Sequence, residues 1–404
     1  MSKKLLLLFA FISVVGFGNA QTAYITNFGD STVSVINVAT NTVTDTIKLG
    51  AAPWGVSVSP DGSKVYASGN DSISVINTAT NAVTANIPVG HNPHGIAVSP
   101  DGSKVYVGNF NSNTVSVINA ITNTVTATIT VGNGPWGSVS ISPDGSKVYV
   151  ANYLPPNTVS VINCAADTMS EVITGVINPK GMVVNQDNSK LYVVEYNRDI
   201  KVINTATDTV LTTITGANGP FGGIAICPDG SRIYVPNFDG TVSVINTIVD
   251  TVAATITVGA LPFGLSVSPY GNKVYVANND SNTVSVINSI TNTVMATIPV
   301  GKSPVAFGNF ISIYPSHLGF APQSILQTIS VYPNPVTTTL TIDIPQAAVG
   351  NIAIYNLLGE EVYSTTNNKP PTTNNIDVSA LPGGVYIVEV KSPQVYKVGK
   401  FVKE

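Results

Sequence analysis

The side chains best suited to chemistry recur at one position of an internal repeat. Every 40 to 44 residues, a large or ionisable residue stands between a proline and a glycine: Trp54, His94, Trp136, Lys180, Phe221 and Phe263. Aromatic faces stack on sugars, peptides and small planar molecules, so one interpretation is a basin that binds such a ligand. The alternative, which the sequence favours, is that these side chains pack between neighbouring repeats. Both interpretations stay open at the level of sequence.

The fourth repeat is the one that concentrates charge. Lys180 opens its first strand, Glu195 ends its second, and Arg198 and Asp199 follow. A hairpin centred on residues 187–188 would set Lys180 opposite Glu195, which predicts a structural ion pair. If the protein has a binding site, we expect it in this sector, together with residues 153–157 of the preceding repeat.

Signatures of catalysis are scarce in this chain. It has no G-x-S-x-G, H-E-x-x-H or phosphate-loop motif, and its repeats hold only two glutamates, Glu171 and Glu195. His91 and His94 could supply two metal ligands, but no third ligand is near them in the sequence. We therefore assign no catalytic residue and expect neither a metal nor a cofactor. Cys164 and Cys227 fall two repeats apart and are expected to stay unpaired.

The repeat itself predicts the elements that position these side chains. The block Val-Ser-Val-Ile-Asn, or a close variant, ends at Asn37, Asn77, Asn119, Asn163, Asn204, Asn246 and Asn288. One repeat divides into four short strands, at residues 93–99, 104–109, 114–119 and 125–131. Ser-Pro-Asp-Gly turns join the first two strands, and one carboxylate per turn is too few for a calcium loop. Seven such repeats predict an all-β, seven-bladed propeller.

The ends of the repeat array predict how the ring closes. The array begins at a second strand, residues 24–27, and finishes with an extra first strand, residues 304–311. One blade would therefore combine strands from both ends of the array, which leaves no open sheet edge.

Composition and the N-terminus bear on location and partners. Residues 1–20 have the basic start, apolar run and small residues of a signal peptide, so the mature chain would carry no transmembrane segment. Charged residues make up 10% of the chain, the net charge is −4, and Arg198 and Arg232 are its two arginines. Such a chain has no basic surface for nucleic acid. We expect an exported monomer.

The linked motifs resemble a known family. Tyr-Val-x-Asn, as at residues 106–109 and 275–278, followed by the Val-Ser-Val-Ile-Asn block and the Ser-Pro-Asp-Gly hairpin, is similar to the YVTN-repeat β-propellers. The resemblance spans about residues 23–313, with departures at residues 66–69 and 192–195. It implies a surface-layer or extracellular propeller, and we expect a non-enzymatic one that binds a ligand or partner. The wider group includes lactonase-like enzymes, which gives the alternative of a lactonase- or lyase-like enzyme acting at the channel mouth.

The composition changes after the repeats. We expect a propeller at residues 21–313, a linker at 314–328, and a small immunoglobulin-like β-sandwich at 329–404. Its motifs resemble a type A sorting domain of the type IX secretion system of Bacteroidota, and the blocks that carry the resemblance include Pro333, Asn334, Pro335, Gly359, Gly384, Tyr386, Lys397, Lys400 and Lys403. The resemblance implies export to the cell surface or the medium, with the outer-membrane secretion machinery as a partner.

Overall fold

A computed structural model describes residues 21–196, 198–312, 327–328, 330–343, 350–356, 361–367, 373–391 and 396–404. The expected signal peptide, most of the expected linker and Gly359 lie outside these ranges. The chain divides into two units, Met1–Gly319 and Phe320–Glu404. Among the described residues no helix is long and apolar enough to cross a membrane.

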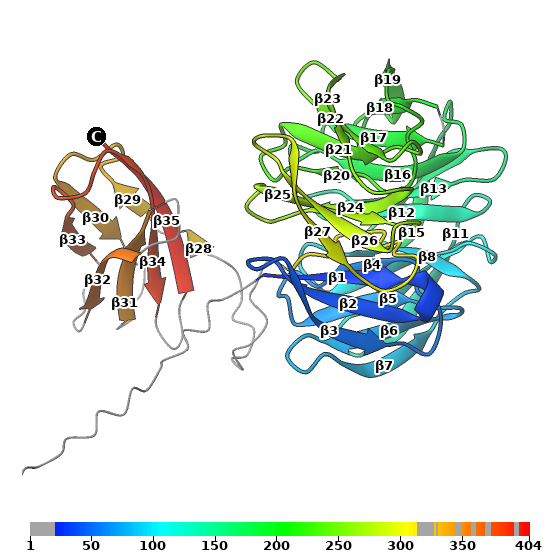
Figure 1. The fold of residues 1–404 in the computed structure, drawn as a ribbon, viewed down its shortest axis with the longest axis horizontal. Coiled ribbons are helices and arrows are strands. Elements are labelled where there is room, and N and C mark those ends of the chain that lie inside the picture. Colours follow the sequence, from blue (N-terminus) through cyan, green and yellow to red (C-terminus); the bar gives the residue numbers. More distant parts are fainter. Residues whose placement is uncertain are drawn as a thin grey trace, which may run out of the picture. The chain divides into compact units, whose positions relative to one another are not determined.

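The first unit is the predicted propeller, built of seven antiparallel sheets (Figure 1). Each repeat folds as one sheet because its apolar residues alternate with Thr, Ser and Asn, the pattern of strands with a buried face. A 3-10 turn, η1 (Phe28–Asp30), follows the first strand.

The strands of the first four blades, in chain order, are β1 (Thr22–Asn27), β2 (Thr32–Asn37) and β3 (Thr42–Lys48); β4 (Val56–Val58), β5 (Lys64–Ser68), β6 (Ser72–Asn77) and β7 (Ala82–Pro88); β8 (Pro93–Val98), β9 (Lys104–Asn109), β10 (Thr114–Asn119) and β11 (Thr124–Thr130); β12 (Pro135–Ile141), β13 (Lys147–Asn152), β14 (Thr158–Asn163) and β15 (Thr168–Ile173).

The strands of the other three blades are β16 (Pro179–Val184), β17 (Lys190–Glu195), β18 (Ile200–Asn204) and β19 (Thr209–Ile214); β20 (Ala225–Ile226), β21 (Arg232–Pro236), β22 (Thr241–Asn246) and β23 (Thr251–Thr257); β24 (Pro262–Val267), β25 (Lys273–Asn278), β26 (Thr283–Asn288) and β27 (Thr293–Pro299).

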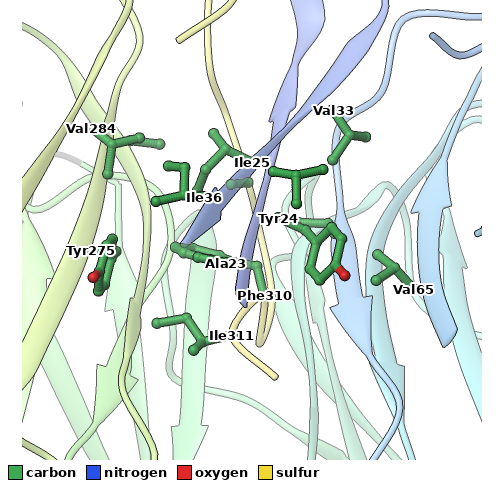
Figure 2. Packing of buried hydrophobic residues seen from close by; sticks show 14 of the residues in the cluster. Ala23, Tyr24, Ile25, Val33, Ile36, Val65, Tyr275, Val284, Phe310 and Ile311 are labelled. Carbon is green, nitrogen blue, oxygen red and sulfur yellow. The ribbon is translucent and has the colours of Figure 1, made fainter. Parts of the chain in front are cut away.

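Ring closure follows the prediction. Residues 304–311 run antiparallel to β1, with bridges from Ala23 to Ile311 and from Asn27 to Pro304. The same segment also bonds to the second blade, because Val56 N donates to Phe307 O at 2.8 Å. Figure 2 shows Phe310 and Ile311 packed beside Ala23 and Tyr24. Both ends of the repeat array thus share one core.

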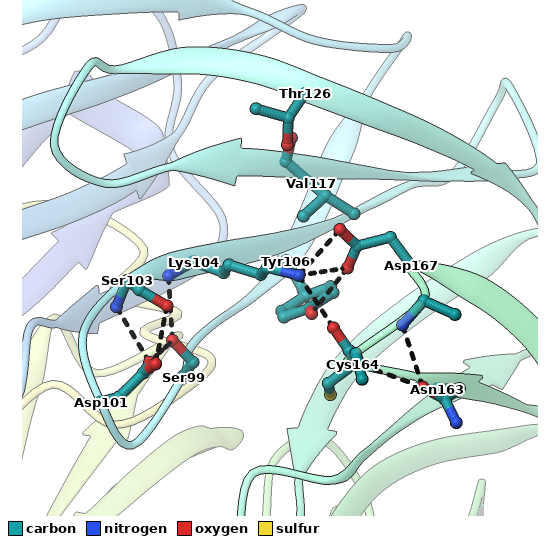
Figure 3. Close-up of polar contacts among 12 residues, drawn as sticks. Ser99, Asp101, Ser103, Lys104, Tyr106, Val117, Thr126, Asn163, Cys164 and Asp167 are labelled. Carbon is teal, nitrogen blue, oxygen red and sulfur yellow. Dashed lines mark hydrogen bonds and ion pairs between the residues drawn. The ribbon is translucent and has the colours of Figure 1, made fainter.

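Turns and latches fix the blades to one another (Figure 3). The carboxylate of Asp101 accepts hydrogen bonds from the Ser99 hydroxyl and the Ser103 amide, which confirms a turn-forming role for this residue. Lys104, which follows Ser103, extends to the following blade. Its Nζ atom donates to Cys164 O and to the Asp167 carboxylate, both at 2.8 Å. Equivalent latches to the next blade start from Lys64, Lys147, Lys190, Arg232 and Lys273.

The second unit is a small β-sandwich. One sheet has the order β28-β35-β34-β31-β32 and the other β29-β30-β33. The strands are β28 (Gln327–Thr328), β29 (Ser330–Tyr332), β30 (Thr339–Asp343), β31 (Gly350–Tyr355), β32 (Glu361–Asn367), β33 (Thr373–Asp377), β34 (Gly384–Lys391) and β35 (Tyr396–Lys403). Buried Leu340 and Ile376 of one sheet and Val388 and Phe401 of the other share one core.

Candidate functional site

Where each blade's innermost segment begins, its backbone lies very close to the backbone of the next blade, all around the propeller. A Cβ atom built on Gly95 would lie 2.0 Å from Gly137 O, and one on Gly264 would lie 2.1 Å from Ala306 O. The same holds around the ring for Gly55, Gly137, Gly181, Gly222 and Gly308, each of which faces the backbone of the next blade at 2.1 to 2.8 Å. Only glycine allows so close an approach. The glycines therefore draw the innermost segments together directly beneath the side chains that precede them.

Six of the residues that directly precede these glycines form a group that we call the collar: Trp54, His94, Trp136, Lys180, Phe221 and Phe263. Its five rings form one continuous aromatic network. Trp54 stacks on His94 with ring centroids 4.6 Å apart, and His94 contacts Trp136 at 5.1 Å. On the other side, Phe221 meets Phe263 at 4.7 Å, and Phe263 meets Trp54 at 6.2 Å. The five aromatic candidates that precede the glycines are thus brought together, and Lys180, the sixth, lies over the rings of Trp136 and Phe221.

A second tier of rings was missed by the sequence analysis. It consists of residues that come one or two positions after the second strand of a blade: Phe28, Phe110, Tyr153, Tyr196 and Phe238. Phe110 contacts both His94 and Trp136, and Tyr196 contacts Phe221 at 5.5 Å. Each of these residues directly follows the Asn position of the Tyr-Val-x-Asn motif, so the motif could have located them. Of the five, the expected binding sector includes only Tyr153, within residues 153–157.

Lys180 lies at the centre of one side of this collar. Its Nζ atom is 4.2 Å from the ring centroid of Phe221, 4.3 Å from Tyr196, 4.7 Å from Trp136 and 5.3 Å from Tyr153. An ammonium among four ring faces is held by cation–π attraction. The side chain is 3% exposed, and burial lowers its pKa to about 8.

Polar nitrogens beside Lys180 lack partners. Three nitrogens are buried and have no hydrogen-bond partner: both ring nitrogens of His94 and the indole nitrogen of Trp136. Burial, and then the charge of Lys180, lowers the pKa of His94 to about 4, so its imidazole is neutral at pH 7. Buried donors without acceptors are costly, and they are uncommon in native proteins.

The predicted ion pair between Lys180 and Glu195 is wrong. Glu195 is paired with Lys201 instead, at 4.0 Å, and it accepts a 2.7 Å hydrogen bond from Ile177 N. In five of the other six blades this place holds an asparagine that donates to a serine, as Asn109 does to Ser116 at 2.9 Å, and in the blade of β4–β7 it holds Gly69. The blade of β16–β19 has charged residues, Glu195 and Lys201, in place of both partners, which leaves Lys180 to the rings. Burial raises the pKa of Glu195, whose side chain is 2% exposed.

Exposure of the collar is uneven. Trp54 and Trp136 are partly exposed, whereas Phe221, Phe263 and His94 are 6%, 7% and 2% exposed. Phe221 does not open to solvent as a residue lining a ligand basin would, because Tyr196, Phe238 and Phe263 all pack on its ring. Of the six residues that precede the glycines, the two tryptophans are therefore the ones that a ligand could reach.

The remaining candidate groups are the possible metal ligands and the two cysteines. Within the described ranges no group of three or more His, Cys, Asp or Glu residues could hold a metal ion, and His91 lies on the surface 3.3 Å from Asp71. Cys164 and Cys227 are free thiols, as expected.

In the second unit, the sorting-motif residues have distinct structural roles. Exposed Asn334, between Pro333 and Pro335, bonds to β35 through Lys400 O and Val402 N. Tyr386 is buried against Phe401. Gly384 begins β34, Lys400 is exposed and Lys403 is 8% exposed. Lys397 lies in β35.

Comparison with known proteins agrees with both units. Residues 330–404 match the family model of a secretion system C-terminal sorting domain, and residues 18–134 match that of a lactonase with a seven-bladed β-propeller. No curated protein matches the chain. The chain thus folds as a seven-bladed β-propeller, whose first part is similar to lactonases of that fold, and its residues 330–404 are similar to C-terminal sorting domains of a secretion system.

Two solved structures show the same fold at low identity. Hydrazine synthase of Kuenenia stuttgartiensis is 23% identical with a TM-score of 0.58, and the match covers 63% of this chain and 88% of that one. A functionally unknown protein from Desulfotomaculum acetoxidans DSM 771 is 16% identical with a TM-score of 0.62, covering 72% and 100%.

Proposed function

We propose that the protein is an exported propeller that binds a ligand at its collar and is delivered by its C-terminal sorting domain. The sorting-domain match supports passage through the type IX machinery of the outer membrane to the cell surface or the medium. An N-terminal signal peptide at residues 1–20 would provide the preceding step across the inner membrane.

The observation that carries the binding role is the partly exposed pair Trp54 and Trp136 on a rigid bed of rings. Indole faces supply a large apolar contact area, and their neighbours hold them in place, so little entropy is lost on binding. The ligand class that stacks on such a face is a glycan, a peptide or a small planar molecule.

The chain offers a direct probe of binding, since its two tryptophans both lie in the collar. Ligands should change the intrinsic tryptophan fluorescence of the full mature chain, and a screen of glycans, peptides and small molecules would find them. Replacing both Trp54 and Trp136 by Ala should abolish binding, measured by calorimetry, and leave the far-ultraviolet circular dichroism unchanged. Undiminished binding by that variant would exclude the collar.

Export is tested separately. Deleting residues 330–404 should leave a folded propeller inside the cell envelope, because the sorting signal is lost while the propeller keeps its own core. Cell fractionation with surface-protease accessibility measures this. Normal surface display of the truncated chain would contradict the role of the sorting domain.

The second candidate is a lactonase-like hydrolase, favoured by the match over residues 18–134, which include His94. Hydrolysis of a panel of lactones by the wild-type chain, lost in His94→Phe, would establish it. The binding role predicts no turnover in this assay.

A further inference from the structure

The collar resembles the aromatic cages with which proteins hold ligand cations, but its cation belongs to the chain. Four rings surround Nζ of Lys180 at 4.2 to 5.3 Å. A cationic ligand would therefore find the ring faces occupied and would meet a like charge in a site of low polarity.

No carboxylate neutralises this ammonium within the described chain. Glu195, the acidic residue on the adjoining strand β17, is engaged by Lys201 and by Ile177 N. The positive charge of Lys180 is thus balanced only by ring quadrupoles, which are weaker than an anion at the same distance.

The unpartnered nitrogens lie on the same side as the tryptophans. Trp136 has both a partly exposed ring and a buried indole N–H without an acceptor, and Lys180 lies over that same ring. His94, also without partners, contacts Trp54 and Trp136. One compact acceptor bearing negative charge could pair with both the Lys180 ammonium and the indole N–H of Trp136.

We propose that the collar binds a monoanion, a carboxylate carried on a flat apolar group, with the carboxylate directed to Lys180 and the indole N–H of Trp136 and the flat group stacked on Trp54 and Trp136. This rests on the proposed binding function and specifies its ligand class.

Three matched probes test the sign of the charge: benzoate, neutral benzamide and cationic benzyltrimethylammonium, each titrated into the full mature chain by calorimetry at pH 7. Benzoate should bind about tenfold or more tighter than benzamide, the effect of one charge-assisted hydrogen bond in a buried site. The cation should bind more weakly than either.

The Lys180→Met variant, which keeps the length of the side chain without its charge, should bind benzoate and benzamide alike. Trp136→Phe keeps a ring but removes the N–H, and should weaken benzoate by about threefold to tenfold, as expected for a neutral donor. Lys302→Met is the control, because it removes the same charge from an exposed loop and should preserve the preference for benzoate.

A pH series on the wild type gives an answer even if Lys180→Met does not fold. The titratable groups that face Lys180 are His94, Tyr153 and Tyr196. The pKa of His94 lies near 4 and burial raises that of Tyr153, so benzoate binding should weaken as pH rises through about 8, where Lys180 loses its charge, while benzamide binding should not.

Equal binding of benzoate and benzamide by the wild type, tighter binding of the cation, or no binding of benzoate would each overturn the proposal. Binding of neutral glycans or peptides that depends on Trp54 and Trp136, without any preference for anions, would preserve the binding function and refute this inference alone.

Discussion

His94 is the residue whose environment has the clearest consequence for stability. It is stacked on Trp54 and is 2% exposed, and its ring nitrogens have no partners. Its pKa is about 4 in the fold and about 6.5 in an unfolded chain. Between these values the unfolded state binds more protons than the native state, so stability is complete above pH 6.5 and falls as pH drops toward 4.

Replacing His94 by Phe should remove this acid sensitivity, because Phe keeps the stacking on Trp54 and does not titrate. Between pH 7 and pH 4 the wild type should lose up to about 3 kcal/mol more of its free energy of unfolding than the variant. Urea unfolding at the two pH values measures the difference. Equal losses in both proteins would show that His94 has the same pKa in the native state as in the unfolded chain.

At the scale of elements, the glycine ring sets how closely the innermost strands meet. Replacing Gly95 by Ala would place a methyl group 2.0 Å from Gly137 O and 2.8 Å from Val139 N, both of which are backbone atoms that cannot move aside cheaply. We expect a loss of about 2 kcal/mol or more in the free energy of unfolding.

Gly50 provides the matched control, since a Cβ there has no atom within 4 Å. Gly50→Ala should change stability by less than about 0.5 kcal/mol. Thermal unfolding of the two variants compares them directly. A Gly95→Ala protein as stable as Gly50→Ala would mean that the innermost strands can separate at no cost.

The sequence predicted elements better than it predicted contacts between them. Strands at residues 104–109 and 114–119 agree with β9 and β10, because turn residues and alternating apolar residues are local signals. The sequence predicts an ion pair between Lys180 and Glu195 on the neighbouring strand. In the structure the Lys180 ammonium instead contacts rings from the blades on both sides, those of Trp136 and Phe221. That geometry depends on the radius and tilt of the blades, which periodicity does not encode.

At the scale of the whole molecule, ring closure depends on residues 304–311. They bond to β1 through Phe310 O and Val305 N, both at 2.9 Å, and to β4 through Phe307 O and Asn309 O. Their side chains add Phe307 and Phe310, both fully buried, to the core.

Replacing residues 304–311 by a flexible Gly-Ser segment of equal length should therefore lower the melting temperature of the propeller far more than deletion of residues 327–404, because it exposes the inner edge of β1 and two apolar cores. Differential scanning calorimetry of the two variants measures this. If both melted like the parent, the first blade would be stable as the three-stranded sheet β1-β2-β3.

The closing segment also sets an order of events in time. The bonds that complete the first blade join partners as distant as Thr26 and Ala306, which are 280 positions apart, so β1 is the first strand to be synthesised and among the last to be fully paired. A chain that is threaded through a membrane N-terminus first would carry an unfinished blade until nearly all of the propeller had emerged. Contacts of such long range make folding slow. If the chain crosses the first membrane as proposed, unfolded and N-terminus first, the ring would lock only after residues 304–311 have crossed.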